Sequence, residues 1–493
     1  MAKSEAEVPQ GEAVEGDVSL LDQIVEQGRF GAEPAARERG KTLVKSFVQE
    51  VLKGEIRIAT DTEAMINARI AQIDHLISTQ LNEVMHHPDF QKLEASWRGL
   101  KYLLGQSETG TALKIKVLNV SKKDLLRDLQ RAPEFDQSAL FKKVYEEEFG
   151  VFGGAPFGCL VGDFEFGKSG QDVELLEKIS QVAAASHAPF LSGTSPDMFN
   201  LESFTQLDAP RDLAKIFDTS EYARWKSFRE TEDSRYVGLT GPRMLLREPY
   251  GRDTVPVEAF DFDEKVGGTE HDKYLWGNSA FALGARINQS FAKYGWCATI
   301  RGVESGGLVE ALPVHNFRTD SGDLAMKCPT ETPVTDRREK ELADLGFIPL
   351  VHAKGTDKAA FFSVQSTQKP KIYDKDAATA NSRVSAQLPY IFAVSRFAHY
   401  LKAMMRDKIG GYSSKEEMTN FLNNWIGNYV VSNDSASFGV KAEKPLKEAR
   451  IDVVEIPGKP GAFRAIAFLR PHFQLDELSV SMRLVADLPP PAQ

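Results

Sequence analysis

The residues with the clearest chemical potential form the run GDFEFGKS between Gly162 and Ser169. This run matches the phosphate-binding pattern GxxxxGKS/T, and it follows an apolar stretch over residues 159–161 that favours a β-strand. In such a loop, backbone N–H groups wrap the phosphate oxygens, the lysine neutralises their charge and the serine hydroxyl binds magnesium. A P-loop ATPase that uses Gly162–Ser169 is therefore one functional hypothesis.

The residues within this motif argue against nucleotide binding. Asp163 and Glu165 place two carboxylates where phosphates would lie, and like charges repel at this range. Their alternation with Phe164 and Phe166 favours the end of a strand over a loop. We expect the next helix to begin near Asp172 rather than directly at the serine, and we find no persuasive strand ending in a metal-binding aspartate. A simple connection from strand to helix explains the segment better.

His86 and His87 could suggest a metal site, but adjacent helical residues point about 100° apart. Both rings therefore cannot easily hold one ion, and no further ligand set accompanies them. The three cysteines, Cys159, Cys297 and Cys328, are far apart, and no HExxH, GxSxG or CxxC pattern occurs. We therefore assign no catalytic residue, no metal ligand and no cofactor-binding residue.

The composition is that of an ordinary globular protein of 493 residues, long enough for two to three domains. Lys and Arg total 60 and Asp and Glu total 70, so the formal net charge is −10. Such an acidic chain is not suited to hold nucleic acid through its overall field. The few scattered cysteines fit a reducing compartment, and we see neither a signal peptide nor an apolar run near the ~18 residues that cross a bilayer. We expect a cytoplasmic protein with no nucleic-acid partner and no membrane insertion.

Helical and strand patterns alternate through most of the chain, and these elements must position any functional site. Apolar periodicity predicts helices over residues 43–52, 60–84, 172–188, 281–293, 390–406 and 415–430. Alternating or β-rich runs predict strands over residues 113–117, 159–161, 296–300, 450–456 and 462–470. This mixture predicts an α/β fold of the mixed α+β kind, with mixed sheets flanked by helices.

The two ends of the chain carry short elements of their own. Residues 19–28 favour a short helix with four apolar residues on one face: Leu20, Leu21, Ile24 and Val25. Such a short helix is marginal alone in water, so it needs a partner's groove or its own protein's core, and the sequence leaves both open. Near the C-terminus, alternation predicts a half-buried strand with four apolar residues on one face: Leu478, Val480, Met482 and Leu484.

Specific sequence blocks occur in order along nearly the whole chain. They are Ile73–His75, His86–Phe90, Trp97–Leu100, Ser186–Phe190, Ser234–Leu239, Tyr294–Ala298, Ile300–Glu304, Leu345–Leu350, Arg406–Gly410 and Leu469–Leu475. Together these blocks resemble the large subunit of the type VI secretion contractile sheath, the TssC/VipB family. The resemblance implies a contractile tail-sheath fold whose terminal arms are exchanged between neighbouring subunits. It also implies a structural protein rather than an enzyme.

The resemblance further implies the partners of the chain. The large subunit pairs with a small sheath subunit as a heterodimer, and these pairs polymerise as a helical sheath around an inner tube protein, anchored on a baseplate. Contraction of the sheath propels the tube. An ATP-driven unfoldase grips a short N-terminal helix for recycling, and residues 19–28 match that helix. The strands implied to join subunits contain Phe463, Ile466, Phe468, Leu478, Val480, Met482 and Leu484.

The same resemblance implies three parts of the chain. Residues 1–60 form an N-terminal arm with the unfoldase-recognition helix and an inter-subunit linker. Residues 61–375 form a sheath core, and residues 376–493 form a C-terminal sheath domain whose terminal strands complete shared sheets. Two alternatives stay open: the P-loop ATPase, and the sheath subunit of a phage-like contractile injection device, which usually polymerises without a small partner.

Overall fold

The structure is a computed structural model that describes residues 38–42, 44–46, 49, 62–319, 321–411, 414–458, 462–472 and 474. The predicted helix over 19–28 and the predicted strand at Leu478–Leu484 lie outside these residues. The chain divides into two compact units, residues 1–80 with 257–262 and residues 81–256 with 263–493, and each is described by itself. The predicted three-part division stays a prediction.

Helix α3 (Thr62–Met85) confirms the long helix predicted over 60–84, and most of it belongs to the first unit. The predicted apolar face of α3 is open to solvent, with side chains between 41% and 51% exposed at Ile66, Ile70, Ile73 and Ile77. An exposed apolar stripe of this kind is typical of a surface that another element covers.

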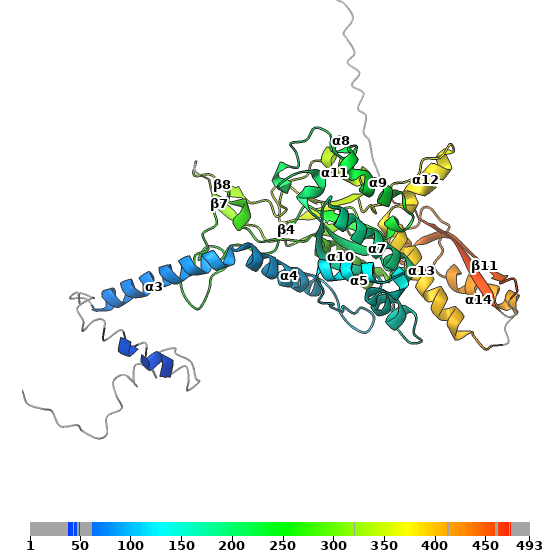
Figure 1. Ribbon diagram of the computed structural model, residues 1–493, viewed down its shortest axis with the longest axis horizontal. Coiled ribbons are helices and arrows are strands. Elements are labelled where there is room, and N and C mark those ends of the chain that lie inside the picture. Colours follow the sequence, from blue (N-terminus) through cyan, green and yellow to red (C-terminus); the bar gives the residue numbers. More distant parts are fainter. Residues whose placement is uncertain are drawn as a thin grey trace, which may run out of the picture. The chain divides into compact units, whose positions relative to one another are not determined.

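The second unit contains the remaining elements (Figure 1). Its helices are α4 (Pro88–Gly105), α5 (Lys122–Arg131), α6 (Ala139–Phe141), the π-helical η2 (Lys142–Phe149), α7 (Gly170–Ser186), α8 (Ala214–Phe217), α9 (Ala223–Glu230), α10 (Ala280–Tyr294), α11 (Asp336–Asp344), α12 (Asp376–Ser385), α13 (Leu388–Asp407), α14 (Lys415–Gly427) and α15 (Phe438–Glu443). Its strands are β1 (Leu160–Phe166), β2 (Phe190–Thr194), β3 (Val237–Gly241), β4 (Met244–Leu245), β5 (Trp276–Gly277), β6 (Leu308–Val309), β7 (Asn316–Arg318), β8 (Leu324–Met326), β9 (Phe347–His352), β10 (Ala359–Phe361), β11 (Leu446–Glu455) and β12 (Phe463–Pro471). This composition confirms the predicted mixed α/β class.

A six-stranded sheet forms the centre of the second unit, in the order β1-β2-β3-β9-β10-β6. The first four strands are parallel, whereas β10 pairs antiparallel with both β9 and β6. A parallel sheet is covered on both faces, so its strands are continuously apolar rather than alternating. In β9, Phe347 and Val351 pack into one apolar core, while Ile348 and Leu350 pack into a second.

Helices cover the two faces of this sheet. Helix α7 packs into the first core and α10 into the second, and both contact β1, β2 and β3. Helix α10 confirms the helix predicted over 281–293. Gly295 ends α10 with a φ of 73°, a left-handed conformation that glycine adopts without strain.

A third core joins α13, α14 and the β11–β12 hairpin near the C-terminal end of the described residues (Figure 1). Trp296 stacks on Phe397 of α13 with ring centroids 4.2 Å apart, and Leu422 of α14 and Ile451 of β11 complete the packing. The hairpin confirms the strands predicted over 450–456 and 462–470, with Ile451 opposite Ala467.

Three predictions of local structure are wrong. Residues 113–117 alternate but form no strand, because no strand pairs with them within the described part of the chain. Residues 296–300 form no strand either, since Trp296 and Ile300 are anchored in different cores by their side chains. Helix α7 begins at Gly170 and not near Asp172, because the Ser169 hydroxyl caps the helix directly.

Candidate functional site

The P-loop motif does not form a loop. Its first five residues, from Gly162 to Phe166, lie in strand β1. Gly162 is explained by packing, since a Cβ atom there would lie 2.6 Å from the ring of Phe190. The carboxylate of Glu165 accepts two hydrogen bonds from the Arg243 guanidinium, at 2.6 and 2.7 Å. This acid is held by a cation and does not approach a phosphate position.

The GKS portion of the motif is already occupied by neighbouring side chains. The backbone N–H of Gly167 donates to the Asp172 carboxylate at 2.8 Å, and the Asp172 N–H donates to the Ser169 hydroxyl at 3.2 Å. Lys168 Nζ donates to the side-chain oxygen of Asn200 at 2.8 Å. A P-loop needs these three groups for phosphate and magnesium, so this geometry favours the strand-to-helix connection.

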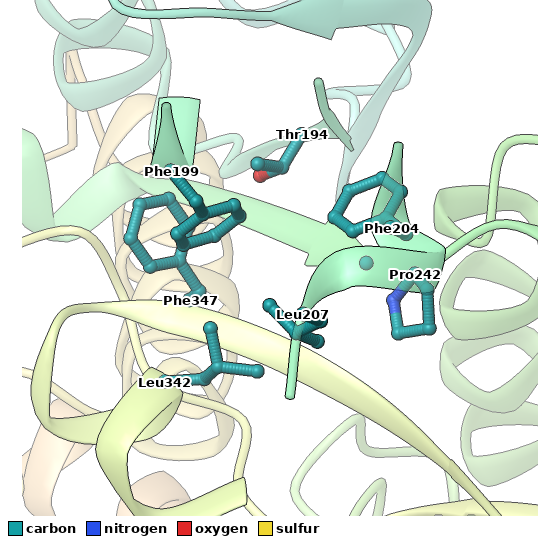
Figure 2. Close-up of a pocket in the computed structure, with 8 residues that line it drawn as sticks. Thr194, Phe199, Phe204, Leu207, Pro242, Leu342 and Phe347 are labelled. Atoms are coloured by element: carbon teal, nitrogen blue, oxygen red, sulfur yellow. The ribbon is translucent and has the colours of Figure 1, made fainter. Parts of the chain in front are cut away.

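The usual ligand position of a parallel α/β sheet is also filled. Ligands in such folds bind beyond the carboxyl ends of the strands. Beside the carboxyl ends of β2 and β3, Phe199, Phe204 and Leu207 pack with Phe347, the first residue of β9, and leave a cavity of about 10 Å³ (Figure 2). A cavity of that size holds about one water molecule, so this crevice has no room for a substrate.

The two histidines of the His86–His87 pair have separate partners. His86 Nε2 lies 3.2 Å from a carboxylate oxygen of Glu264, whose side chain is buried against Arg247 at 2.6 and 3.0 Å. The His87 ring accepts from the Asp89 N–H at 3.3 Å and caps helix α4. Among the described residues, no three His, Cys, Asp or Glu side chains lie close enough to hold a metal ion.

A large groove opens beside the outer edge of β1. Its volume is about 1820 Å³, and α4 and α10 contribute residues to its lining. One wall is β1, the edge strand of the six-stranded sheet, and the other is residues 111–121, which we call the strap. The strap is attached at Lys116, which pairs with Glu148, and just beyond its end, where Lys122 Nζ donates to the Glu165 carbonyl at 2.7 Å.

The strap presents an apolar surface without strand pairing. Leu113 and Ile115 are partly buried, whereas Val117 is 69% and Leu118 is 52% exposed. None of the strand pairs in the described part of the chain involves the strap or the outer edge of β1. The groove therefore lies between β1 and the strap, and among the described residues neither has a strand partner on this side. The alternating apolar residues over 113–117 were the sequence signal for the strap. That pattern did not show that the strap has no pairing strand within the described part of the chain.

The β11–β12 hairpin has one covered edge and one open edge. The Asn423 side chain of α14 donates to the Ile451 carbonyl at 2.7 Å and accepts from the Ile451 N–H at 2.9 Å. At the start of β11, Leu446 exchanges backbone hydrogen bonds with residues 429 and 431. No described strand pairs with the far edge of β12. Among the described residues, the edge of β11 is thus covered at Leu446 and Ile451, whereas no strand or side chain is shown to cover the edge of β12 opposite Ile451.

The predicted inter-subunit residues of β12 fall on two faces. Phe463 packs partly into the third core, whereas Ile466 and Phe468 are 42% and 52% exposed on the opposite face. The guanidinium of Arg450 lies 4.9 Å from the centre of the Phe468 ring. The other predicted interface residues lie outside the described residues: Leu20, Leu21, Ile24, Val25, Leu478, Val480, Met482 and Leu484.

No helix in the described ranges is both long enough and apolar enough to span a bilayer.

Comparison with models of known protein families identifies the class of protein to which this chain belongs. Residues 67–368 match the EvpB/VC_A0108 tail sheath N-terminal domain, and residues 377–488 match the EvpB/VC_A0108 tail sheath gpW/gp25-like domain. These matches define a tail sheath protein. The chain belongs to the EvpB/VC_A0108 (VipB) tail sheath family, which confirms the resemblance to the TssC/VipB family.

Individual relatives agree with this assignment. The type VI secretion system sheath protein TssC1 of Pseudomonas aeruginosa is 52% identical over 457 residues, covering 92% of each chain. The cryo-EM structure of the anti-feeding prophage baseplate matches at 11% identity and a TM-score of 0.34, over 64% of this chain and 66% of that one. The contracted helical sheath of the same prophage matches at 12% identity and a TM-score of 0.28, over 63% and 66%. Because both TM-scores are below 0.5, the assignment rests on the sequence matches.

Proposed function

We propose that this chain is the structural large subunit of a type VI secretion contractile sheath in the bacterial cytoplasm. It pairs with a small sheath subunit, polymerises around an inner tube protein on a baseplate, and contracts to propel the tube. Membership of the tail sheath family and 52% identity to TssC1 support this role. The filled crevice and the occupied GKS residues favour a structural protein over an ATPase.

The observation that carries the pairing step is the incomplete edge of the central sheet. An open edge strand offers N–H and C=O groups that a strand of another chain can bind. Beside β1 the groove already supplies a second extended wall, the strap, with exposed Val117 and Leu118. We infer that an extended segment of the small subunit lies between β1 and the strap, with apolar side chains against both walls.

Photo-crosslinking in the co-expressed heterodimer tests this placement. A benzophenone side chain at Leu118, inside the groove, should crosslink to the small subunit. The same side chain at Ile372, which is 84% exposed and does not line the groove, is the matched control. Crosslinks from Ile372 but none from Leu118 would contradict the placement, while the sheath role itself would be judged separately by electron microscopy.

The contact between neighbouring pairs is proposed to use the free edge of β12. Antiparallel strands alternate between residue pairs that bond to each other and pairs whose N–H and C=O groups point outward. The N–H and C=O groups of Ile451 point away from β12 and bond to the Asn423 side chain. Ala467 lies directly opposite Ile451, so the N–H and C=O groups of Ala467 point away from β11, to the free edge of β12. A strand from a neighbouring subunit, with Leu478–Leu484 as the candidate donor, would bond there.

Substitution at Ala467 tests this edge without breaking the hairpin. Ala467→Pro removes the outward N–H and should abolish sheaths in electron micrographs, while the heterodimer still forms. Ala467→Val keeps the N–H and should assemble normally. Normal sheaths from the proline variant would exclude strand addition at this edge.

The recycling step and the remaining alternative have their own tests. Deleting residues 19–28 should leave sheath assembly intact and block disassembly by the ATP-driven unfoldase, and loss of assembly would contradict that role. Expression without the small subunit separates the two sheath classes. Sheaths formed by this chain alone would favour a phage-like injection device.

A further inference from the structure

A thiol and an imidazole meet at the end of β9. Cys328 follows β8 and His352 closes β9, and Sγ of Cys328 lies 3.3 Å from Nδ1 of His352. The other ring nitrogen, Nε2, lies 2.8 Å from the Thr356 carbonyl oxygen and donates its hydrogen to it. Because Nε2 keeps this proton, the Nδ1 atom that faces the sulfur is free to accept the thiol proton.

The surroundings of the sulfur favour its ionised form. The Thr330 hydroxyl oxygen lies 3.2 Å from Sγ. Burial raises the pKa of Cys328, but hydrogen bonds with His352 and Thr330 and the charge of His352 outweigh burial, and the pKa falls below its ordinary value. The same hydrogen bond raises the pKa of His352 against the effect of burial. The two shifts bring the pKa values of the thiol and the imidazole closer together, which eases transfer of the proton from sulfur to Nδ1.

The residue before Cys328 is a lysine whose ammonium group has partners of its own. Lys327, the preceding residue, donates to the Gly268 carbonyl at 3.1 Å and lies 4.7 Å from the centre of the Tyr274 ring. Burial lowers the pKa of Lys327, and the charge of Cys328 acts in the opposite direction. His352, at hydrogen-bond distance, is the charged group that lowers the pKa of the Cys328 thiol.

The other two cysteines differ from Cys328 in the pKa of the thiol and in the hydrogen bond to a histidine. Cys159 and Cys297 pack against the second core, where burial raises the pKa of each thiol, for Cys297 to about 12. Neither has a histidine hydrogen bond among the described residues. The chain thus contains two thiols with a raised pKa that serve as internal references for the third.

We propose that Cys328 is a nucleophilic thiol and a site of covalent modification by small, soft electrophiles, with His352 as its base. With an α-iodoamide, the sulfur lone pair forms an S–C bond, the C–I bond breaks, and iodide leaves with the bonding electrons. The thiol proton passes to Nδ1 of His352. Cys328 is only partly exposed, so the site takes small uncharged reagents in preference to large ones.

Limited alkylation of the full chain tests the proposal. The protein is treated with substoichiometric iodoacetamide from about pH 5 to about pH 9, and peptides with each cysteine are quantified by mass spectrometry. At about pH 7, Cys328 should react at least about tenfold faster than Cys159 or Cys297. Equal or slower reaction at Cys328 would overturn the proposal.

Removal of the base separates His352 from simple accessibility. His352→Gln should lower the alkylation rate of Cys328 about tenfold near neutral pH and move its pH profile upward toward that of a free thiol, near pH 8.5. An unchanged profile in the folded variant would exclude His352 as the base. If the variant does not fold, the wild-type profile decides: half-maximal reactivity clearly below pH 8.5 supports the pair, and a midpoint at or above it overturns the pair.

Discussion

The carboxyl end of the central sheet and its β1 edge show opposite designs. At the carboxyl end, aromatic side chains of the same chain fill the crevice where many α/β proteins hold a ligand (Figure 2). At the β1 edge, the chain leaves a groove of about 1820 Å³ between two extended walls. The difference shows how the fold treats two positions. Its own side chains fill the place where an α/β sheet usually holds a ligand, whereas the edge of β1, where a strand of another chain could pair, stays open.

The largest expected effect concerns the closed end. Phe347 is 2% exposed and packs on Phe199 with ring centroids 4.8 Å apart, and its ring stacks on Trp225 at 5.6 Å. Phe347→Ala should lower the free energy of unfolding by about 3–5 kcal/mol, measured by denaturant titration. Phe152→Ala, at a 78% exposed side chain, should change it little. Equal effects would show that Phe347 does not contribute packing energy to this end of the sheet.

An intermediate effect concerns pH at the open side, where His399 lines the groove. Burial lowers the pKa of His399 to about 4, helped by nearby Arg396, His187 and Lys402, while its hydrogen bond to the Ser186 carbonyl opposes the shift. Protonation of His399 is therefore easier in the unfolded state than in the folded state. The free energy of unfolding is highest above about pH 6.5, and it falls by roughly 2–3 kcal/mol as the pH drops toward 4.

Thermal unfolding across this pH range checks the assignment. His399→Phe should flatten the loss of stability between about pH 6.5 and pH 4. A wild-type curve that is flat over this interval would contradict the lowered pKa of His399.

The smallest effect concerns Lys168 in the P-loop pattern. Its ion pair with Glu221 is partly exposed, with Nζ 3.4 Å from the carboxylate, so Lys168→Ala should change stability by about 0–1 kcal/mol. We expect no ATP turnover that depends on Lys168, measured by phosphate release in wild type and variant. Turnover that disappears with the lysine would show that the closed end does perform chemistry and would favour the ATPase.

The sequence predicts the elements whose signals are local. Helix α10 and the β11–β12 hairpin agree with periodicity and turn residues, because each is specified by its own apolar pattern and by a stop such as Gly295. Residues 113–117 carry a true strand pattern, but a strand exists only where another strand pairs with it, and that partner is not visible in local sequence. The same limit hid the edge-covering role of Asn423 and the approach of His352 to Cys328, since both contacts join residues from separate elements.

The Asn423 contact has a consequence for how an assembly can grow. The Asn423 side chain takes the outward N–H and C=O groups of Ile451, so a strand that pairs with the hairpin at this position can bind only at the β12 edge. Under the proposed strand exchange, every subunit then has one acceptor position and gives one donor, which fixes a one-to-one stoichiometry along the chain of contacts. Such a chain has a direction, and its two ends differ. In the proposed sheath, the Asn423 side chain would thereby help to set which edge of each hairpin receives the strand of its neighbour.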